Sequence, residues 1–309
     1  MDYILTTNQL TKIYGDNAAV SHLNMHVKRG SIYGFLGPNG SGKSTTMKMM
    51  MNLVKPTEGS ITMFGKSLEE NSADILRRVS AMIETPAFYG NLSAEQTLQI
   101  HCEYMGYYKT EDCQKTLELV GLTGTGRKPV RKFSMGMKQR LGIARAILTH
   151  PEVLILDEPI NGLDPEGALQ IRSLLKRLNR EDGTTILISS HILSEIEQIA
   201  DTVGILKKGK LIKEVTMEEV YAVSGSYTEL EVSDVRKAGY VLEEVMKISN
   251  YRVISDSVVR IYEEGVDNNV LADALLRQQV WIKGISVRHL TLEEYFHQMI
   301  GGEGYDALS

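Results

Sequence analysis

The sequence has few cysteines and lacks long apolar runs, and both absences exclude classes of protein. Its two cysteines among 309 residues, Cys102 and Cys113, have the spacing of neither a metal site nor a redox motif. This excludes a disulfide-rich secreted domain and indicates a reducing cytoplasm. No stretch approaches the roughly 18 uninterrupted apolar residues of a membrane span. The N-terminus, MDYILTTNQLTKIYG, lacks the basic and apolar regions of a secretory signal.

The chain also lacks an excess of positive charge. Its formal net charge is −5, and residues 226–309 carry 14 acidic and 8 basic side chains, which leaves the first 225 residues near +1. An acidic tail and a nearly neutral body provide no basic stripe for DNA or RNA, so we expect no nucleic-acid partner. They also give no reason to expect adhesion to anionic lipid.

Residues 1–225 are predicted to form an α/β domain. Three nearly continuous apolar runs, SIYGFLG (31–37), EVLILDEP (152–159) and TTILISSH (184–191), suit strands that are buried on both faces of a parallel sheet. Residues 91–150 are mostly helical in pattern, with a break from Gly121 to Pro129. We therefore expect a helical subdomain, at about 88–150, inserted between the strands of the α/β core.

A second, smaller α+β domain is predicted over residues 226–309. Its order of elements, βαββαβ, is that of a ferredoxin-like fold. The expected elements are strands at 227–232, 251–255, 258–262 and 281–289 and helices at 234–245 and 266–279.

A last helix is expected after these elements. Thr291 begins a Thr-x-x-Glu capping box that ends at Glu294, and the helix would continue through Tyr295, Phe296 and Met299.

The nine residues GPNGSGKST match the phosphate-binding P-loop pattern and lie between an apolar strand and a helical segment. They are Gly37, Pro38, Asn39, Gly40, Ser41, Gly42, Lys43, Ser44 and Thr45. The glycines allow successive backbone N–H groups to converge on phosphate oxygens. Lys43 would contact the β- and γ-phosphates, and the Ser44 hydroxyl would bind Mg²⁺. The alternative, a chance glycine turn, is disfavoured by the strand–loop–helix context.

Two carboxylates and a histidine follow other apolar strands. Asp157 would hold Mg²⁺, and Glu158 would orient or deprotonate the attacking water. His191 suits a sensor of the γ-phosphate. Alone, an Asp-Glu pair after a strand is usually the start of a solvated loop, and a lone histidine is usually a core or loop residue. Together with a P-loop, all three indicate catalysis.

The segment FSMGMKQRLGIARAIL, residues 133–148, has the apolar pattern of a helix with Ser134 at its N-cap. A helix N-terminus favours an anion. The segment has no obvious use within a single P-loop site.

The order of these motifs resembles the ATP-binding subunit of ABC transporters over about residues 1–220. The order is Tyr14, the P-loop, IETPAF, FSMGMKQR, VLILDEP, NGLDP and SSHIL. The resemblance implies the cassette fold, ATP and Mg²⁺ as cofactors, and a head-to-tail dimer in which Ser134 and Gly136 contact the γ-phosphate bound by the partner chain. It also implies that Tyr14 stacks on adenine and that Asp164 lies at the dimer seam.

Two departures from the family pattern concern the signature and the loop at Glu84. The usual Leu-Ser-Gly-Gly-Gln is Phe-Ser-Met-Gly-Met here, so Met135 and Met137 replace a glycine and the glutamine. Glu84 replaces a glutamine that contacts Mg²⁺ in the family, and a carboxylate keeps the metal-binding oxygens. With a glutamate at this position, the loop resembles that of the ABC-protein branch that exports bacitracin and lantibiotics. The alternative is that Glu84 is a solvated loop residue.

The resemblance implies an ATPase that powers export of a peptide antibiotic or similar amphiphile through a separate membrane permease, and so confers self-immunity or resistance. The partner cassette would be a second copy or a paralogue, and the chain would lie at the inner face of the cell membrane. An importer subunit with a regulatory tail is an alternative, as is a non-transport ABC ATPase that acts on DNA or ribosomes. A small P-loop kinase would leave the signature, NGLDP and SSH segments without a role.

Overall fold

A computed structural model describes residues 2–107, 109, 111–223, 226–263, 266–289 and 292. The described residues form two compact units, one up to Met217 and one from Glu218 onward. The division lies at the start of helix α8 (Met217–Val223), whereas the sequence-based boundary lies at its end. The predicted last helix and its capping box at Thr291 and Glu294 fall outside the described residues. No helix within the described ranges has the length and hydropathy to cross a lipid bilayer.

The first unit contains a six-stranded sheet of order β10-β9-β3-β8-β7-β6. Its strands are β3 (Ile32–Leu36), β6 (Val79–Met82), β7 (Val153–Asp157), β8 (Thr185–Ser190), β9 (Thr202–Lys207) and β10 (Lys210–Thr216). All neighbours pair in parallel except β10, which is antiparallel to β9. All residues of β3, β7 and β8 are buried. The continuous apolar runs are therefore strands buried on both faces, as the sequence predicts.

A second, antiparallel sheet of order β2-β1-β4-β5 packs on this core. It comprises β1 (Tyr3–Tyr14), β2 (Asn17–Lys28), β4 (Glu58–Met63) and β5 (Lys66–Ser67). Met47, Met49 and Met50 are buried between this sheet and β3 in one apolar cluster. Because a methionine side chain is flexible, a run of them can fill the irregular space between two differently oriented sheets.

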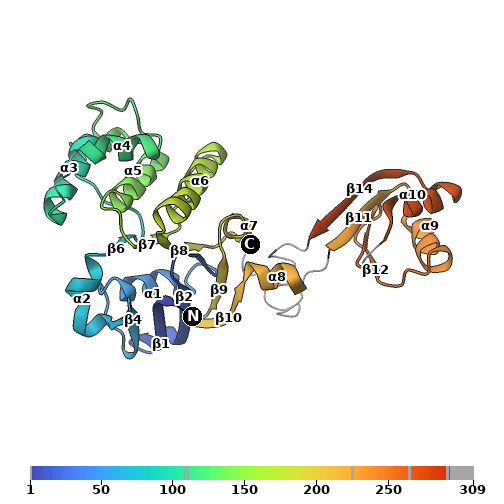
Figure 1. Cartoon of the computed structure of the whole chain (residues 1–309), viewed down its shortest axis with the longest axis horizontal. Helices are drawn as coiled ribbons and strands as arrows, with labels where there is room; N and C mark the ends of the chain where they lie inside the picture. The colour runs from blue at the N-terminus through green and yellow to red at the C-terminus, as the bar shows by residue number, and fades with distance from the viewer. Residues whose placement is uncertain are drawn as a thin grey trace. The chain divides into compact units, whose positions relative to one another are not determined.

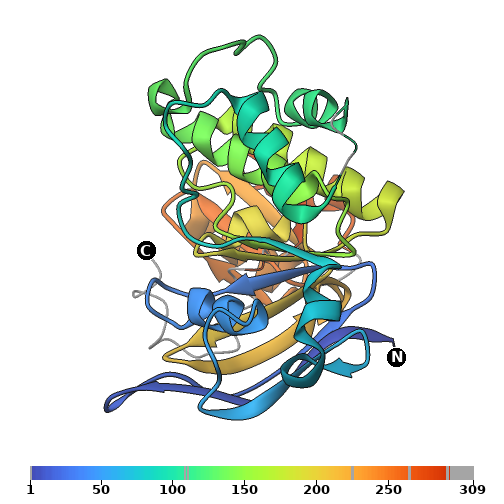
Figure 2. The ribbon, with the colours of Figure 1, turned by 90° about the vertical axis from the view of Figure 1, so that its left-hand side faces the viewer.

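Helices connect the strands of the first unit. They are α1 (Lys43–Met50), α2 (Leu68–Leu76), α3 (Ala94–Met105), α4 (Glu111–Leu119), α5 (Met135–Ile147), α6 (Pro165–Asp182) and α7 (Leu193–Glu197), with a 3-10 turn at Val130–Lys132. Figures 1 and 2 show α3, α4 and α5 together on one side of the six-stranded sheet, with the antiparallel sheet on the other side. Helices over 91–150 with a break before the signature segment agree with the prediction.

The helical group holds both cysteines, and they are not disulfide-bonded. Cys102 on α3 and Cys113 on α4 are buried free thiols with their Sγ atoms 3.7 Å apart. Their place is therefore in the packing between α3 and α4.

The second unit has the strand order β12-β13-β11-β14, with all neighbours antiparallel. Its elements are β11 (Ser226–Val232), α9 (Val235–Tyr240), a π-helical turn (Val241–Val245), β12 (Tyr251–Val253), β13 (Val258–Ile261), α10 (Asn268–Arg277) and β14 (Ile282–His289). This is the βαββαβ order expected from the sequence. The unit has its own apolar core, which includes Leu230, Val259 and Leu275.

Candidate active site

The loop between β3 and α1 has the backbone shape that a bound phosphate requires. Gly42 has a φ of 107°, and Gly40 has a φ of 77°. A Cβ at Gly42 would lie 2.4 Å from the Ala19 carbonyl oxygen, and one at Gly37 would lie 2.3 Å from the Leu206 carbonyl oxygen. Glycine is therefore required at Gly37 and Gly42 by close backbone approach, and at Gly40 and Gly42 by the left-handed backbone.

Lys43 is held inside this loop. Its side chain is 5% exposed, and its Nζ donates to the carbonyl oxygens of Gly37, at 2.5 Å, and Pro38, at 3.2 Å. Burial lowers the pKa of Lys43, while the carboxylates of Glu158 and Asp157 oppose that shift. The ammonium group is thus directed at the centre of the loop, where phosphate oxygens would neutralise it.

Ser41 supplies an independent sign that the loop is shaped for a polar ligand. Its Oγ is buried and has no hydrogen-bond partner within the described structure. A buried hydroxyl without a partner costs free energy, so such an atom at a P-loop fits a phosphate oxygen as its missing partner.

Asp157 lies at the carboxyl end of β7, between two serine hydroxyls. Ser44 Oγ donates to Asp157 Oδ2 at 2.6 Å, and Ser189 Oγ donates to Asp157 Oδ1 at 2.6 Å. Since β3, β7 and β8 are neighbouring parallel strands, their carboxyl ends bring these three residues together. Ser44 and Asp157 carry oxygen atoms of the kind that Mg²⁺ prefers, so they suit the ion, and their role as its ligands stays a prediction. Ser189 is not among the residues predicted from the sequence, although the SSH segment contains it.

Glu158 connects the other predicted catalytic residues. Its Oε2 lies 2.8 Å from His191 Nδ1, and its Oε1 lies 3.6 Å from Lys43 Nζ. Its φ of 47° is in the left-handed region, which is strained for a residue with a side chain. The Ser189 hydroxyl accepts a hydrogen bond from the Glu158 backbone N–H at 2.9 Å and so supports this conformation.

Glu84 lies with these residues around one cavity of about 280 Å³. Ser44, Asp157 and Glu158 line it, as do Met135 and Gln139 of α5. Glu84 has a φ of 61°, and its Oε1 lies 2.5 Å from Lys48 Nζ. Within the described residues, no group of three or more His, Cys, Asp and Glu side chains could hold a metal alone. A cation here would need the Ser44 hydroxyl and nucleotide oxygens as well.

The signature segment forms the start of α5. Ser134 is the N-cap, and its Oγ accepts a hydrogen bond from the Met137 N–H at 3.2 Å. A Cβ at Gly136 would be 3.4 Å from Leu163, an ordinary contact. Of the described residues, neither Ser134 nor Gly136 lines the cavity beside Asp157, so their use by a partner chain stays a prediction. Gln139, which the sequence analysis did not single out, donates to the Glu158 carbonyl oxygen at 3.0 Å.

Tyr14 and Asp164 have defined local positions, and their predicted roles remain predictions. Tyr14 is half exposed at the end of the β1–β2 hairpin, and Lys12 Nζ lies 5.1 Å from its ring centroid. The ring is therefore open to a stacking partner. Asp164 is the N-cap of α6 and accepts a hydrogen bond from the Gly167 N–H at 3.3 Å.

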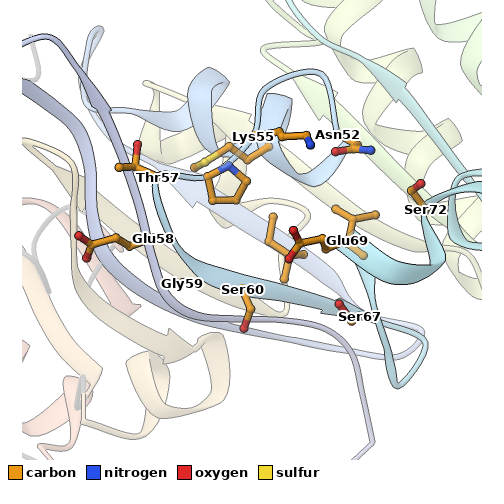
Figure 3. Close-up of a pocket in the computed structure, with 13 residues that line it drawn as sticks. Asn52, Lys55, Thr57, Glu58, Gly59, Ser60, Ser67, Glu69 and Ser72 are labelled. Carbon is orange, nitrogen blue, oxygen red and sulfur yellow. The ribbon is translucent and has the colours of Figure 1, made fainter.

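A separate cavity of about 480 Å³ lies between β4, α2 and the chain that follows α1 (Figure 3). Its polar lining includes Asn52, Lys55 and Glu69, and Figure 3 shows them on its walls with several hydroxyl side chains. In the part of the chain that the structure describes, none of the predicted site residues lines it. The predicted site residues Ser44, Glu84, Asp157 and Glu158 line the cavity at Asp157 instead.

The fold and the site are those of the class of P-loop ATPase cassettes. This class combines a parallel sheet and a helical insert with a P-loop, two carboxylates at a strand end and a histidine. A sequence profile described as ABC transporter matches residues 20–161. The chain is 48% identical over 307 residues to an uncharacterized ABC transporter ATP-binding protein, YcbN, of Bacillus subtilis (strain 168), with 99% of this chain and 100% of YcbN covered. The chain thus belongs to the ATP-binding proteins of ABC transporters, and the predicted family and cassette fold are confirmed.

Two further similarities bear on function. The chain is 45% identical over 302 residues to the bacitracin transport ATP-binding protein BcrA of Bacillus licheniformis, covering 98% of this chain and 99% of BcrA. A dimeric post-hydrolysis structure of the ATP-binding cassette MJ0796, bound to ADP and Pi, matches with a TM-score of 0.64 and 25% identity. That match covers 69% of this chain and 98% of MJ0796.

Proposed function

We propose that this chain is the ATP-hydrolysing subunit of an exporter that moves a peptide antibiotic of the bacitracin type, or a similar amphiphile, through a separate membrane permease. The similarity to BcrA over nearly the full length of both chains supports the export role. The observation that carries the ATPase is the cluster of Lys43, Glu158 and His191 at the P-loop. The expected consequence is resistance or self-immunity.

Hydrolysis follows from the positions of three side chains. Lys43 binds the phosphates, and Glu158 accepts a proton from the attacking water as a general base. His191, 2.8 Å from Glu158 Oε2, holds the carboxylate in place and can bind the γ-phosphate through its other ring nitrogen. Mg²⁺, when bound by Ser44, Asp157 and Glu84, would neutralise charge on the phosphate oxygens.

The complete site requires a second cassette. The positive end of α5, with Ser134 at its N-cap, favours an anion by only about 0.3–2 kcal/mol. This is too little to hold a nucleotide alone, but it suffices as one half of a sandwich around ATP. The dimeric state of MJ0796 supports such an arrangement with a second copy or a paralogue. Phosphate release would let the two chains separate.

That movement is delivered to a permease at the inner face of the cell membrane. Glu84 lies in the loop between β6 and α3, so a change at the cation is transmitted toward the helical group. We expect Glu84→Gln to alter the ATPase rate and transport. If both rates stay at the wild-type value, Glu84 has no coupling role.

The test uses cells that express the chain with its co-encoded permease. We expect a higher minimal inhibitory concentration of bacitracin, which falls to the control value for Glu158→Gln. The purified Glu158→Gln protein should lose ATP turnover by about 10²- to 10⁴-fold and form an ATP-dependent dimer on size-exclusion chromatography with light scattering. A monomer at saturating ATP and Mg²⁺ would contradict the shared site. If cells that express the chain are no more resistant than control cells, and the purified chain hydrolyses ATP normally, the export role is contradicted and the ATPase role is not.

A further inference from the structure

Lys48 forms an ion pair with Glu84 at the edge of the nucleotide cavity. Lys48 lies on α1, just over one helical turn after Lys43, and its Nζ is 2.5 Å from Glu84 Oε1. The side chains are 31% and 60% exposed, so both can change partner without opening the core. The pair joins the P-loop helix to the loop that precedes α3.

The loop that contains Glu84 is held in a strained conformation by two different helices. The φ of 61° at Glu84 is costly for a residue with a Cβ, so surrounding contacts must maintain it. From α5, Arg145 Nη1 donates to the Ala87 carbonyl oxygen at 3.3 Å, and its guanidinium lies 5.1 Å from the Phe88 ring centroid. From α1, the contact is the Lys48 ion pair. The conformation of the loop therefore depends on contacts with both α1 and α5.

The carboxylate of Glu84 has two possible partners of the same charge sign. Ser44 and Asp157 line the same cavity as Glu84 and carry the other oxygen atoms expected around a divalent cation. An oxygen that is neutralised by the Lys48 ammonium is less available to such a cation. The two cations compete because the attraction of each for the carboxylate weakens the binding of the other.

We propose that Lys48 is a positioning residue that holds Glu84 when the site lacks a divalent cation and releases it when the cation binds. The exchange makes loop 83–88 responsive to occupancy of the nucleotide site. A glutamine at position 84 would have no charge for Lys48 to neutralise, so this exchange of partners requires the glutamate. The inference rests on the proposed role of Glu84 as a cation ligand.

The test measures cation affinity with the full chain, ADP and Mn²⁺ as the probe. Free Mn²⁺ is followed by electron paramagnetic resonance, so the readout does not depend on turnover. We expect Lys48→Met to tighten Mn²⁺ binding about two- to fivefold, the range that a partly exposed ion pair allows. Lys48→Arg keeps the positive charge and should bind Mn²⁺ with the wild-type affinity. Lys66→Met is the matched control. Lys66 Nζ lies 2.5 Å from Asp74 Oδ2, and this ion pair is not part of the nucleotide cavity, so the substitution should not change Mn²⁺ affinity.

A second background separates competition from general electrostatics. Removing any positive charge near a cation favours its binding, so Lys48→Met is repeated in Glu84→Gln protein. If Lys48 acts through Glu84, the substitution has little further effect there. An equal gain in both backgrounds overturns the proposal, as does no gain in either one. If the wild-type chain binds no ADP with Mn²⁺, the proposed function itself fails.

Hydrogen exchange of loop 83–88 gives an independent readout. In the wild type, binding of Mn²⁺ with ADP should change the rate of amide hydrogen exchange in this loop. The Lys48→Met protein should show part of that change in rate before the cation is added. Exchange that is unaffected by the cation in the wild type would also overturn the proposal. Thermal unfolding of each variant verifies that it remains folded.

Discussion

Ser189 is a fully buried hydroxyl on which two acidic residues of the site depend. It donates to Asp157 Oδ1 at 2.6 Å and accepts from the Glu158 N–H at 2.9 Å. Ser189→Ala would leave the buried Asp157 carboxylate and the partly buried Glu158 N–H without this partner. We expect the free energy of unfolding to fall by about 1–3 kcal/mol in a urea titration, with a loss of ATP turnover because both carboxylates become less well oriented.

The neighbouring residue Ser190 provides the control. Its hydroxyl also makes two hydrogen bonds, to Glu195 and from the Ile192 N–H, but neither partner lines the nucleotide cavity. Ser190→Ala should cost a similar free energy of unfolding and leave the ATPase rate of the folded protein much closer to wild type. Equal loss of turnover in the two variants would mean that stability, not orientation, explains the Ser189 effect.

At this scale, the sequence predicts residues whose function is encoded locally. Lys43, Asp157 and Glu158 are recognisable because a loop pattern or the end of an apolar run marks them. Ser189 and Gln139 lie within the SSH and FSMGMKQR segments, but those segments do not show which atoms the two side chains contact, and Lys48 lies in no motif. Each contacts the site only because strands or helices distant in sequence become neighbours, so their roles depend on tertiary register.

Helix α5 contains two glycines that serve different purposes. A Cβ at Gly142 would lie 2.6 Å from Met82 Sδ and 2.8 Å from Pro86 Cγ, whereas one at Gly136 would make only ordinary contacts. Gly142 therefore allows the helix to approach loop 83–88 closely. We expect Gly142→Ala to destabilise the fold by about 1–2 kcal/mol, because overpacking outweighs the gain in helix propensity.

Gly136→Ala is the matched substitution in the same helix. It should leave the melting temperature unchanged or slightly raised, since alanine favours the helix and meets no clash. In Glu158→Gln protein it should nevertheless weaken the ATP-dependent dimer on size-exclusion chromatography. Normal dimer formation in that variant would remove Gly136 from the predicted phosphate contact.

The packing of α3 against α4 makes stability sensitive to alkaline pH. Burial, together with the hydrogen bond to Cys102, raises the pKa of the Cys113 thiol to about 12. A thiol in the unfolded chain has a pKa near 8.5, so the unfolded state loses its proton first as the pH rises. The stabilisation from the buried neutral thiol is full below about pH 8.5 and declines above it.

Cys113→Ala tests this dependence. Between about pH 8.5 and pH 10, the wild-type protein should lose about 1–2 kcal/mol more of its free energy of unfolding than the variant does. Urea titrations at both pH values measure the difference. A constant gap between the two proteins would show that the thiol titrates normally in the fold.

At the scale of elements, the buried strands and the helices were predictable because their periodicity is strong. The unbroken apolar runs became β3, β7 and β8, and Ser134 became the N-cap of α5. The long strands β1 and β2 were not predicted. Their register contains several irregularities, and exposed and buried residues do not alternate regularly along β1. The π-helical turn at Val241–Val245 likewise has no sequence pattern that separates it from a helix.

For the whole molecule, all residues assigned to the nucleotide site belong to the first unit, which extends to Met217. The second unit has a separate core, and its sequence carries the acidic surplus. Three roles are open to it: dimerisation, binding of a regulator and bracing of the cassette. Only bracing would make nucleotide binding depend on it.

We therefore expect a chain that ends at Val223 to bind ADP and Mg²⁺ within about twofold of the full-length affinity, as measured by isothermal titration calorimetry. The physical reason is that the P-loop, Asp157 and Glu158 depend on contacts within the six-stranded sheet. MJ0796 is matched over 98% of its length by 69% of this chain, which supports a cassette that folds without such a tail. A folded truncated chain that loses ADP binding would assign the bracing role to the second unit. Retained ADP binding with loss of the ATP-dependent dimer in Glu158→Gln protein would assign dimerisation to it instead.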